Sequence, residues 1–361
     1  MRAVVFTEPD HFELTDVPDP AHLHLRAVQV SGADLVTVAV KATTICGTDV
    51  KILHGTVPFV TFPHIPGHEF GGEIVEVGAN VKGLHVGDLI GVEAHVGCGK
   101  CPRCLEGLYN LCENYGDKES GHAHIGFTVA GGLAEYCAVP AKAAHLIPEG
   151  LTASHAMFTD TLGIVLWAFE RAGGVKGGET VAVVGPGALG LLAVQVARAL
   201  GAGRIIVVGI AADEKRLELA NTMGADDIVL TETGGGPVES VHELTNGKGV
   251  DLVVEFAGTS DAGKQSLEMA RRGGRVVLAG ATSPGRELNV DLSVIVRGHL
   301  NVFGSVANPM SISRRANLLM QKGLVDVAPL ITHEMPLDEF AAAWKMFTER
   351  VDDPIRIMMH P

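Results

Sequence analysis

One six-residue motif, Gly185-Pro186-Gly187-Ala188-Leu189-Gly190, constrains the fold of this 361-residue chain more than any other feature. This G-x-G-x-x-G motif lies between a short apolar run at residues 181–184 and an alanine- and leucine-rich helical pattern that ends at Leu200. In a strand-turn-helix unit, the first glycine makes the turn, the second lets a pyrophosphate approach the backbone, and the third lets helix and strand pack closely. The motif therefore predicts a dinucleotide-binding unit of an α/β protein.

Alternating strand and helix patterns continue through the middle of the chain. Helical patterns occur at residues 213–223 and 261–270, and short apolar runs predict further strands at residues 205–208, 228–230, 252–255, 276–278 and 300–303. Such alternation is typical of parallel strands joined by crossover helices. Together with residues 181–184, these runs provide enough strands for a doubly wound parallel sheet of the Rossmann type.

The N-terminal part of the chain has a different pattern. Its apolar runs, at residues 35–40, 72–77, 89–92 and 134–139, are short and separated by Gly, Pro and Asp, which predicts a β-rich unit with many turns. Amphipathic patterns at residues 311–322 and 337–348 predict C-terminal helices. We therefore expect a β-rich domain at 1–158, a Rossmann domain at 159–300, and a segment at 301–361 that returns to the first domain.

Composition narrows the partners and the location. The chain has 28 Lys and Arg residues against 42 Asp and Glu, a formal charge of −14, and no basic block that would indicate a nucleic-acid or anionic-membrane partner. The N-terminus reaches Glu8 before a signal-peptide core can form. The uncharged run at 180–197 approaches membrane-spanning length, but its glycine motif would break such a helix. We expect a cytoplasmic protein with no membrane segment.

Four of the six cysteines are crowded into one short segment with the spacing C-x₂-C-x₂-C-x₇-C: Cys98, Cys101, Cys104 and Cys112. This spacing can place four thiolates around one ion, as a closed tetrahedral zinc site requires. Disulfides or unrelated buried cysteines are the alternatives, and both are less common for such a pattern in a cytosolic chain. A closed site has no open coordination position, so we expect a structural zinc lobe at about residues 95–115.

A second group of metal-binding residue types is spread along the sequence. Cys46 opens the segment Cys-Gly-Thr-Asp, and His68 and Glu69 follow Gly67. A lone cysteine or histidine is usually a packing residue. A thiolate, an imidazole and a carboxylate together, however, are the ligands of a catalytic zinc ion that keeps one position open for water or substrate.

With these motifs in this order, the chain resembles the zinc-containing medium-chain dehydrogenase/reductase superfamily, which includes alcohol, sorbitol, butanediol and threonine dehydrogenases. The resemblance covers essentially the whole chain. It implies a GroES-like catalytic domain with an inserted Rossmann domain, two zinc ions per chain, and hydride transfer between NAD(P) and a small alcohol or carbonyl substrate. It also implies a homodimer or homotetramer paired through the edge strand at 300–303.

The resemblance assigns Cys46 and His68 as ligands of the catalytic zinc. The third ligand varies in the superfamily and is expected here at Asp160, with Glu69 as the alternate or exchanging ligand. Asp160 as a helix cap and Glu69 as an ion-pair partner are the structural alternatives. The four clustered cysteines are implied to hold the structural zinc.

The same resemblance implies a proton path. Thr48 corresponds to the hydroxyl that takes the substrate proton, and Asp49 is expected to hold the non-metal nitrogen of His68. Many relatives carry a relay histidine where this chain has Lys51, so Lys51, the nearby His54 or solvent could complete the transfer. His95 corresponds to a histidine near the substrate in threonine dehydrogenases, or is an exposed loop residue.

The residues predicted to contact the cofactor are Gly185, Pro186, Gly187, Leu189, Gly190, Asp213, Arg216, Phe256, Ala257, Ala279, Gly280, Phe303 and Arg356. Asp213 lies late for the acid that binds the adenosine ribose and could instead cap a helix. NAD is therefore favoured only weakly over NADP. The resemblance implies that Arg356 reaches the pyrophosphate.

The substrate is the least constrained part of the prediction. A carboxylate-completed zinc site resembles sorbitol and threonine dehydrogenases, so we expect a secondary alcohol or polyol substrate, with threonine or another amino alcohol as the alternative. A non-catalytic scaffold with the same fold, or a zinc-free quinone or enoyl reductase, would not need Cys46, His68 and a carboxylate ligand.

Overall fold

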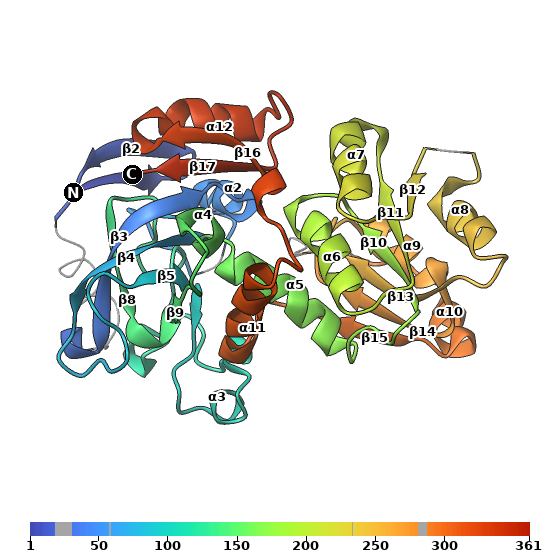
Figure 1. The fold of residues 1–361 in the computed structure, drawn as a ribbon, viewed down its shortest axis with the longest axis horizontal. Coiled ribbons are helices and arrows are strands. Elements are labelled where there is room, and N and C mark those ends of the chain that lie inside the picture. The colour runs from blue at the N-terminus through green and yellow to red at the C-terminus, as the bar shows by residue number, and fades with distance from the viewer. Residues whose placement is uncertain (19–30, 58, 233, 281–286) are drawn as a thin grey trace. The chain divides into compact units, whose positions relative to one another are not determined.

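The structure is a computed structural model that describes residues 1–18, 31–57, 59–232, 234–280 and 287–361. The chain divides into two units (Figure 1). The first unit comprises Met1–Gly163, Ala307–Lys322 and Leu330–Pro361, and the second comprises Ile164–Val306 and Gly323–Pro329. The division falls within the helix α5 (Thr159–Arg171).

A seven-stranded sheet forms the centre of the first unit, in the order β16-β17-β3-β4-β5-β9, with β8 also paired to β3. Its strands are β3 (Leu35–Thr44), β4 (Phe70–Val77), β5 (Leu89–Val92), β8 (Tyr136–Pro140), β9 (Ala144–Leu146), β16 (Ile331–Pro336) and β17 (Arg356–His360). The C-terminal strand β17 pairs antiparallel with β3 (Figure 1).

Shorter elements surround this sheet. Two antiparallel pairs are formed by β1 (Arg2–Glu8) with β2 (His11–Asp16) and by β6 (His95–Val96) with β7 (Ala123–His124). The helices are α2 (Gly47–Leu53), α3 (Pro102–Leu105), α4 (Ala153–Ala156), α11 (Met310–Gln321) and α12 (Phe340–Thr348). Single 3₁₀ turns lie at Gly32–Asp34, Tyr109–Leu111, Lys118–Ser120, Ala141–Ala143, Ala328–Leu330 and Leu337–Glu339.

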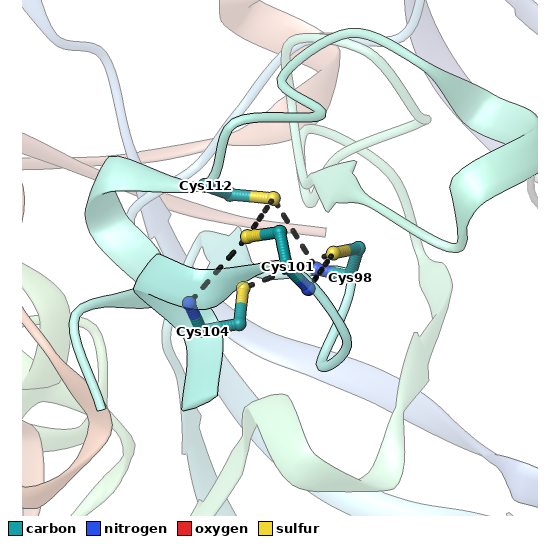
Figure 2. A group of neighbouring side chains, drawn as sticks. All are labelled: Cys98, Cys101, Cys104 and Cys112. Carbon is teal, nitrogen blue, oxygen red and sulfur yellow. Dashed lines mark hydrogen bonds between the residues drawn. The ribbon is translucent and has the colours of Figure 1, made fainter. Parts of the chain in front are cut away.

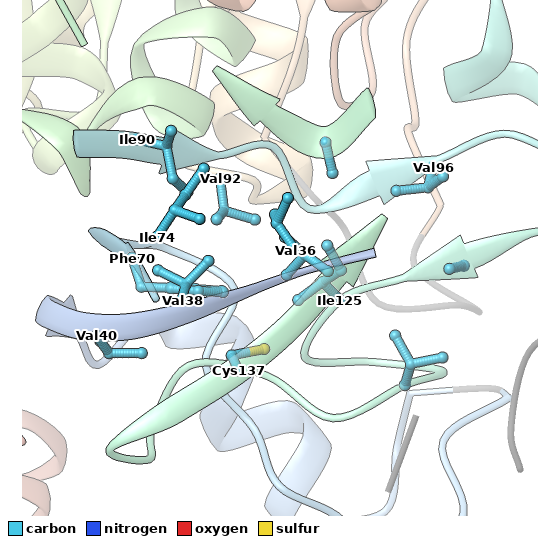
Figure 3. Packing of buried hydrophobic residues seen from close by; sticks show 14 residues of the cluster. Val36, Val38, Val40, Phe70, Ile74, Ile90, Val92, Val96, Ile125 and Cys137 are labelled. Carbon is cyan, nitrogen blue, oxygen red and sulfur yellow. The ribbon is translucent and has the colours of Figure 1, made fainter. Parts of the chain in front are cut away.

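The core of the first unit explains why this sheet holds its register. Val36, Val38 and Val40 alternate along β3 and pack with Phe70 and Ile74 of β4 in one buried cluster (Figure 3). Side chains two residues apart in a strand point to the same face, so the apolar alternation fixes which face is buried. The ends of β3 and β4, which carry the predicted metal ligands, are thereby anchored to a packed core.

The second unit contains a six-stranded sheet in the order β12-β11-β10-β13-β14-β15, with every neighbouring pair parallel. Its strands are β10 (Thr180–Val184), β11 (Arg204–Gly209), β12 (Asp227–Leu230), β13 (Val250–Glu255), β14 (Ala270–Leu278) and β15 (Asn301–Gly304). This is the strand order of the doubly wound dinucleotide-binding fold. All six predicted strands are confirmed, although β14 begins well before the predicted run at 276–278.

The helices of the second unit are α6 (Ala188–Ala199), α7 (Glu214–Thr222), α8 (Gly236–Leu244), α9 (Ser260–Met269) and α10 (Leu292–Gly298). A 3₁₀ turn at Ala211–Asp213 precedes α7, so the helix predicted at 213–223 starts one residue later. The uncharged run at 180–197 is strand β10, the glycine turn and most of α6. Within the described ranges, no helix is long and apolar enough to cross a membrane.

Candidate active site and metal centres

The glycine turn of the second unit has the geometry that a bound pyrophosphate needs. Gly185 has a φ of +93°, and a Cβ there would lie 2.8 Å from the backbone nitrogen of Ala257. A Cβ on Gly190 would collide with the carbonyl oxygen of Gly185. A Cβ on Gly187, the N-cap of α6, would meet nothing within 4 Å. The open space at a helix N-terminus therefore fits a dinucleotide phosphate.

Other predicted cofactor residues follow the carboxyl ends of the neighbouring strands. Phe256 and Ala257 follow β13, whereas Ala279 and Gly280 follow β14, and Phe303 lies within β15. This edge of an open parallel sheet is where ligands bind.

Glu255, which the sequence did not single out, organises this edge. Its carbonyl oxygen accepts hydrogen bonds from the nitrogens of Ala279 (3.0 Å) and Gly280 (2.9 Å), and its carboxylate accepts one from Gly258 (2.5 Å). Burial raises the pKa of Glu255. Its position at the end of an apolar strand was the available signal.

The predicted ribose contact is placed at the start of α7. Asp213 is the N-cap residue of α7, and its side chain makes no capping hydrogen bond. Arg216 lies within the first turn of the same helix. Glu232 fixes the turn before the helix, because its carboxylate oxygens accept a hydrogen bond from Ala211 at 3.1 Å.

The four clustered cysteines converge on one point of the first unit (Figure 2). The Sγ atoms of Cys98 and Cys104 are 3.9 Å apart, as are those of Cys101 and Cys112, and all four atoms lie within 4.8 Å of one another. Tetrahedral Zn–S bonds of about 2.3 Å give sulfur–sulfur distances of about 3.8 Å. All four cysteines are free of disulfides, so the geometry fits a Cys₄ zinc site.

Backbone and side-chain N–H groups point at these sulfurs. Cys98 Sγ accepts hydrogen bonds from the nitrogen of Cys101 (3.4 Å) and from Asn114 Nδ2 (3.3 Å). Burial alone would raise the pKa of the Cys98 thiol, but donors including the N–H groups of Lys100 and Cys101 lower it to about 6. The segment therefore stabilises a thiolate, the form that binds metal.

The second donor set lies where β3 and β4 meet. Thr43 pairs with Phe70 in the antiparallel register, so Cys46, just past β3, faces His68 and Glu69, just before β4. One donor atom from each of these three residues lies within 4.8 Å of the others. Cys46 is the N-cap of α2, and its Sγ is 3.8 Å from the Thr48 hydroxyl.

Asp49 contacts both Cys46 and His68. One carboxylate oxygen accepts a hydrogen bond from the Cys46 nitrogen at 2.8 Å, and the other lies 3.4 Å from His68 Nδ1. Burial disfavours a charged His68, but Asp49 and Cys46 outweigh it and raise the pKa of His68. A thiol, two carboxylates and an imidazole thus form a buried site that favours positive charge, and the donor types fit zinc.

Arg356 is part of this site. Its guanidinium donates to Glu69 at 2.9 Å, and both side chains are almost fully buried. In this structure Arg356, which the resemblance implies to reach the cofactor pyrophosphate, balances the charge of one carboxylate beside the metal donors.

Asp160 lies in the first turn of α5 and is 5% exposed. It is not in the group of donors within 4.8 Å, and one of its oxygens accepts a hydrogen bond from the Ala94 nitrogen at 3.2 Å. Burial and the neighbouring Glu93 raise the pKa of Asp160 to about 7, although His68 opposes this shift. The sequence missed Glu93, whose carboxylate binds His145 Nε2 (2.8 Å), Ser313 Oγ (2.9 Å) and the Tyr109 hydroxyl.

The two relay candidates differ in setting. His54 is an exposed residue whose ring nitrogen pairs with Asp10. Lys51 is half-buried in α2, and its carbonyl oxygen accepts a hydrogen bond from the Thr56 hydroxyl at 3.0 Å.

His95 belongs to a cluster of rings that the sequence did not predict. The ring cluster consists of His95, Tyr115, His122, His124 and Phe127. The Phe127 ring is 4.9 Å from the His68 ring and stacks on His124 at 3.8 Å. His124 in turn stacks on His95 at 4.9 Å, so the ring cluster extends from His68 to His95.

The fold and the two donor sets together define a zinc-binding dehydrogenase. A family model described as Alcohol dehydrogenase GroES-like domain matches residues 32–149, and one described as Zinc-binding dehydrogenase matches residues 188–321. The L-threonine 3-dehydrogenase of Bacillus licheniformis is 37% identical over 317 residues, which are 86% of this chain and 87% of that protein. The chain belongs to the zinc-containing medium-chain dehydrogenase/reductase superfamily.

Two further relatives match along the whole chain. The sorbitol dehydrogenase of Halalkalibacterium halodurans is 32% identical over 364 residues and covers 100% of this chain and 99% of that protein. A provisionally assigned zinc-binding dehydrogenase of Sinorhizobium meliloti 1021, solved with bound NADP, has a TM-score of 0.87 at 33% identity, covering 100% of this chain and 99% of that one. The predicted fold class and enzyme class, a zinc-dependent, NAD(P)-dependent alcohol dehydrogenase, are confirmed.

Proposed function

We propose that the chain oxidises a secondary alcohol or polyol to the corresponding ketone, and catalyses the reverse reduction. The observation that carries this proposal is the meeting of Cys46, His68 and Glu69 donors within 4.8 Å, with the Thr48 hydroxyl beside Cys46. When bound, zinc lowers the pKa of an alcohol oxygen and the nicotinamide accepts a hydride. Each chain would hold two zinc ions, the second between the four clustered cysteines.

The residues around the donors have distinct roles in this proposal. Thr48 takes the proton of the substrate hydroxyl, since its hydroxyl lies next to the metal-binding thiol. Asp49 orients His68 through Nδ1, which leaves Nε2 for the metal. Lys51, in the same short helix, passes the proton outward, whereas His54 is already engaged by Asp10.

We propose that Asp160 is the third zinc ligand and that Glu69 exchanges with it. Glu69 lies closer to His68 and Cys46 in this structure, but its charge is balanced by the buried Arg356. Asp160 is buried beside Glu93, and among the described residues no Lys or Arg is paired with it. A buried carboxylate without a counter-charge is costly, and a metal ion would supply that charge.

The two carboxylates can be tested separately. Asp160→Asn is expected to weaken zinc affinity at the catalytic site by more than about 100-fold, which exceeds the usual effect of a residue that contacts only a metal ligand. Glu69→Gln should weaken the zinc affinity by about 10-fold. Zinc titration with a chelator competitor, together with kcat, measures both. A larger loss in Glu69→Gln than in Asp160→Asn would reverse the assignment.

Gly187 tests the cofactor site. Gly187→Val would fill the open space at the N-terminus of α6 with a side chain, so we expect the KM for NAD(P) to rise at least about 10-fold while the fold is kept. Gly177→Val, in the same unit and also with nothing within 4 Å of its Cβ, is the matched control. An unchanged KM in Gly187→Val would place the cofactor elsewhere.

Threonine is the second candidate substrate, because L-threonine 3-dehydrogenases are among the most similar relatives. The deciding experiment is a panel of secondary alcohols, polyols and L-threonine, each assayed with NAD and with NADP by absorbance of the reduced nicotinamide. Highest kcat/KM for a polyol or secondary alcohol supports the proposal. Preference for L-threonine replaces it with the second candidate, and no activity on any member contradicts both.

The proposed assembly is a homodimer or homotetramer. The edge strand β15 and the neighbouring helix α10 expose Val302 (39%), Leu292 (69%) and Val296 (72%), and a second copy could cover such an edge. We also propose that the protein acts in the cytoplasm, since none of its six cysteines forms a disulfide, as is usual in a reducing compartment.

A further inference from the structure

Glu93 is a buried carboxylate that the proposed reaction does not use. It follows strand β5 and is 1% exposed. Its Oε2 accepts hydrogen bonds from His145 Nε2 at 2.8 Å and from Ser313 Oγ at 2.9 Å, and its Oε1 accepts one from the Tyr109 hydroxyl. Three donors around one carboxyl group suit the ionised form, which only accepts hydrogen bonds. Because these donors come from β9, α11 and the lobe of the four cysteines, Glu93 joins three segments that are distant in the sequence.

Tyr109 ties Glu93 to the site of the four cysteines (Figure 2). It opens the short 3₁₀ turn before Cys112, whose N–H donates to the Tyr109 carbonyl oxygen at 3.0 Å. A Cβ on Gly97 would collide with both the Cβ of Tyr109 and the Sγ of Cys104, so the tyrosine and a zinc-binding sulfur pack against the same glycine. The position of the phenol ring therefore depends on whether the four sulfurs are gathered around an ion.

On its other side, the backbone beside Glu93 holds Asp160. The Glu93 N–H donates to the carbonyl oxygen of Ala143 at 2.9 Å, and the Ala94 carbonyl oxygen accepts from the Ile125 N–H at 2.8 Å. The Ala94 N–H donates to Asp160 Oδ1 at 3.2 Å, which leaves Oδ2 as the oxygen for a metal ion. A movement of the Glu93 side chain would turn the adjacent Ala94 N–H and, with it, the Asp160 carboxylate.

We propose that Glu93 is a positioning residue that couples the two zinc sites. When the four cysteines enclose their ion, Tyr109 holds Glu93 in place. The neighbouring Ala94 N–H then orients Asp160 toward the catalytic zinc. This inference rests on the proposed function, because it takes Asp160 as the third ligand. Such a coupling free energy is reciprocal, so occupancy of either zinc site raises the affinity of the other.

Tyr109→Phe and Glu93→Gln test this coupling through zinc affinity. Tyr109→Phe removes only the hydroxyl, and Glu93→Gln keeps the side-chain shape but replaces one acceptor oxygen by a donor. The measurement is the zinc affinity of the catalytic site in the full chain, by competition with a chelator. We expect it to weaken on the order of tenfold in Tyr109→Phe and roughly 10–100-fold in Glu93→Gln. Tyr136→Phe, at an exposed tyrosine of the same unit, is the matched control and should leave the affinity unchanged.

Two further backgrounds distinguish positioning from a general loosening of the unit. In Asp160→Asn, neither Tyr109→Phe nor Glu93→Gln should weaken the catalytic site further, because both act through Asp160. Cys104→Ser, which empties the other site, should weaken the catalytic site at least as much as Tyr109→Phe does. The Cys46→Ser chain supplies the reference affinity of the four-cysteine site, so each zinc ion in the titration can be assigned.

Wild-type zinc affinity of the catalytic site in both Tyr109→Phe and Cys104→Ser would overturn the coupling. A further loss in the Asp160→Asn background would overturn the route through Asp160. If Asp160→Asn itself keeps the wild-type zinc affinity, the ligand assignment of the proposed function fails. A weakened Asp160→Asn beside an unchanged Tyr109→Phe overturns only the present inference. If Glu93→Gln or Cys104→Ser does not fold, Tyr109→Phe decides alone.

Discussion

A Cys46→Ser variant is expected to lose dehydrogenase activity by roughly a thousandfold or more, because a metal ion supplies several kcal/mol of charge stabilisation to such a reaction. The variant should also contain one zinc ion per chain, since the four clustered cysteines are untouched. Metal analysis of the purified protein and steady-state kinetics on the same sample measure both effects.

Cys137→Ser is the matched control for this experiment. Cys137 is buried in the core of the first unit, outside both donor sets, and its Sγ lies 3.7 Å from the carbonyl oxygen of Ala130, which a serine hydroxyl can also contact. It should keep both zinc ions and the activity. Full activity in Cys46→Ser would remove Cys46 from the catalytic site.

Cys104→Ser is expected to release the other zinc ion and to destabilise the lobe around residues 95–115. Structural zinc contributes its binding free energy to folding, so the loss should be several kcal/mol. Limited proteolysis should then cleave first between residues 98 and 112. Activity should fall as well, because the Tyr109 hydroxyl of this lobe binds Glu93, next to the Ala94 nitrogen that holds Asp160.

Thermal unfolding with and without a zinc chelator measures this effect, and Cys137→Ser again serves as the control. Retention of two zinc ions by Cys104→Ser, with unchanged thermal stability and cleavage pattern, would contradict a structural Cys₄ site. The measurement is independent of the catalytic donors, which lie at the junction of β3 and β4.

Features that depend on local spacing were predictable from the sequence. In the structure, Gly185 needs glycine because its φ is positive, and Gly190 needs glycine because a Cβ there would collide with the carbonyl oxygen of Gly185. The clustered cysteines converge because their spacing is short enough to wrap around one ion. The parallel strands follow from apolar runs of strand length between helical patterns.

Features that depend on contacts between distant segments were not predictable. Arg356 meets Glu69 across 287 residues because β17 is inserted next to β3, and no local pattern indicates that pairing. His95 meets His124 through a strand pair only two residues long, which is too short for a recognisable periodicity, and it meets His122 just before that pair. The exact set of metal donors is also undetermined by sequence, because it depends on which way each carboxylate points.

The substrate is undetermined for the same reason. Of the large side chains near the N-terminal motifs, Phe59 is 58% exposed and packs edge-on against Tyr115, whereas Met157 is almost fully buried. Sequence alone does not distinguish these two positions.

Zinc-edge anomalous diffraction from crystals of the zinc-loaded protein tests the central claim most directly, because it locates each metal ion without relying on activity. The account predicts two peaks per chain: one between the sulfurs of Cys98, Cys101, Cys104 and Cys112, and one bound by Cys46 and His68 with a carboxylate of Asp160 or Glu69. A single peak at the four cysteines, with none at Cys46 and His68 in an active sample, would contradict it.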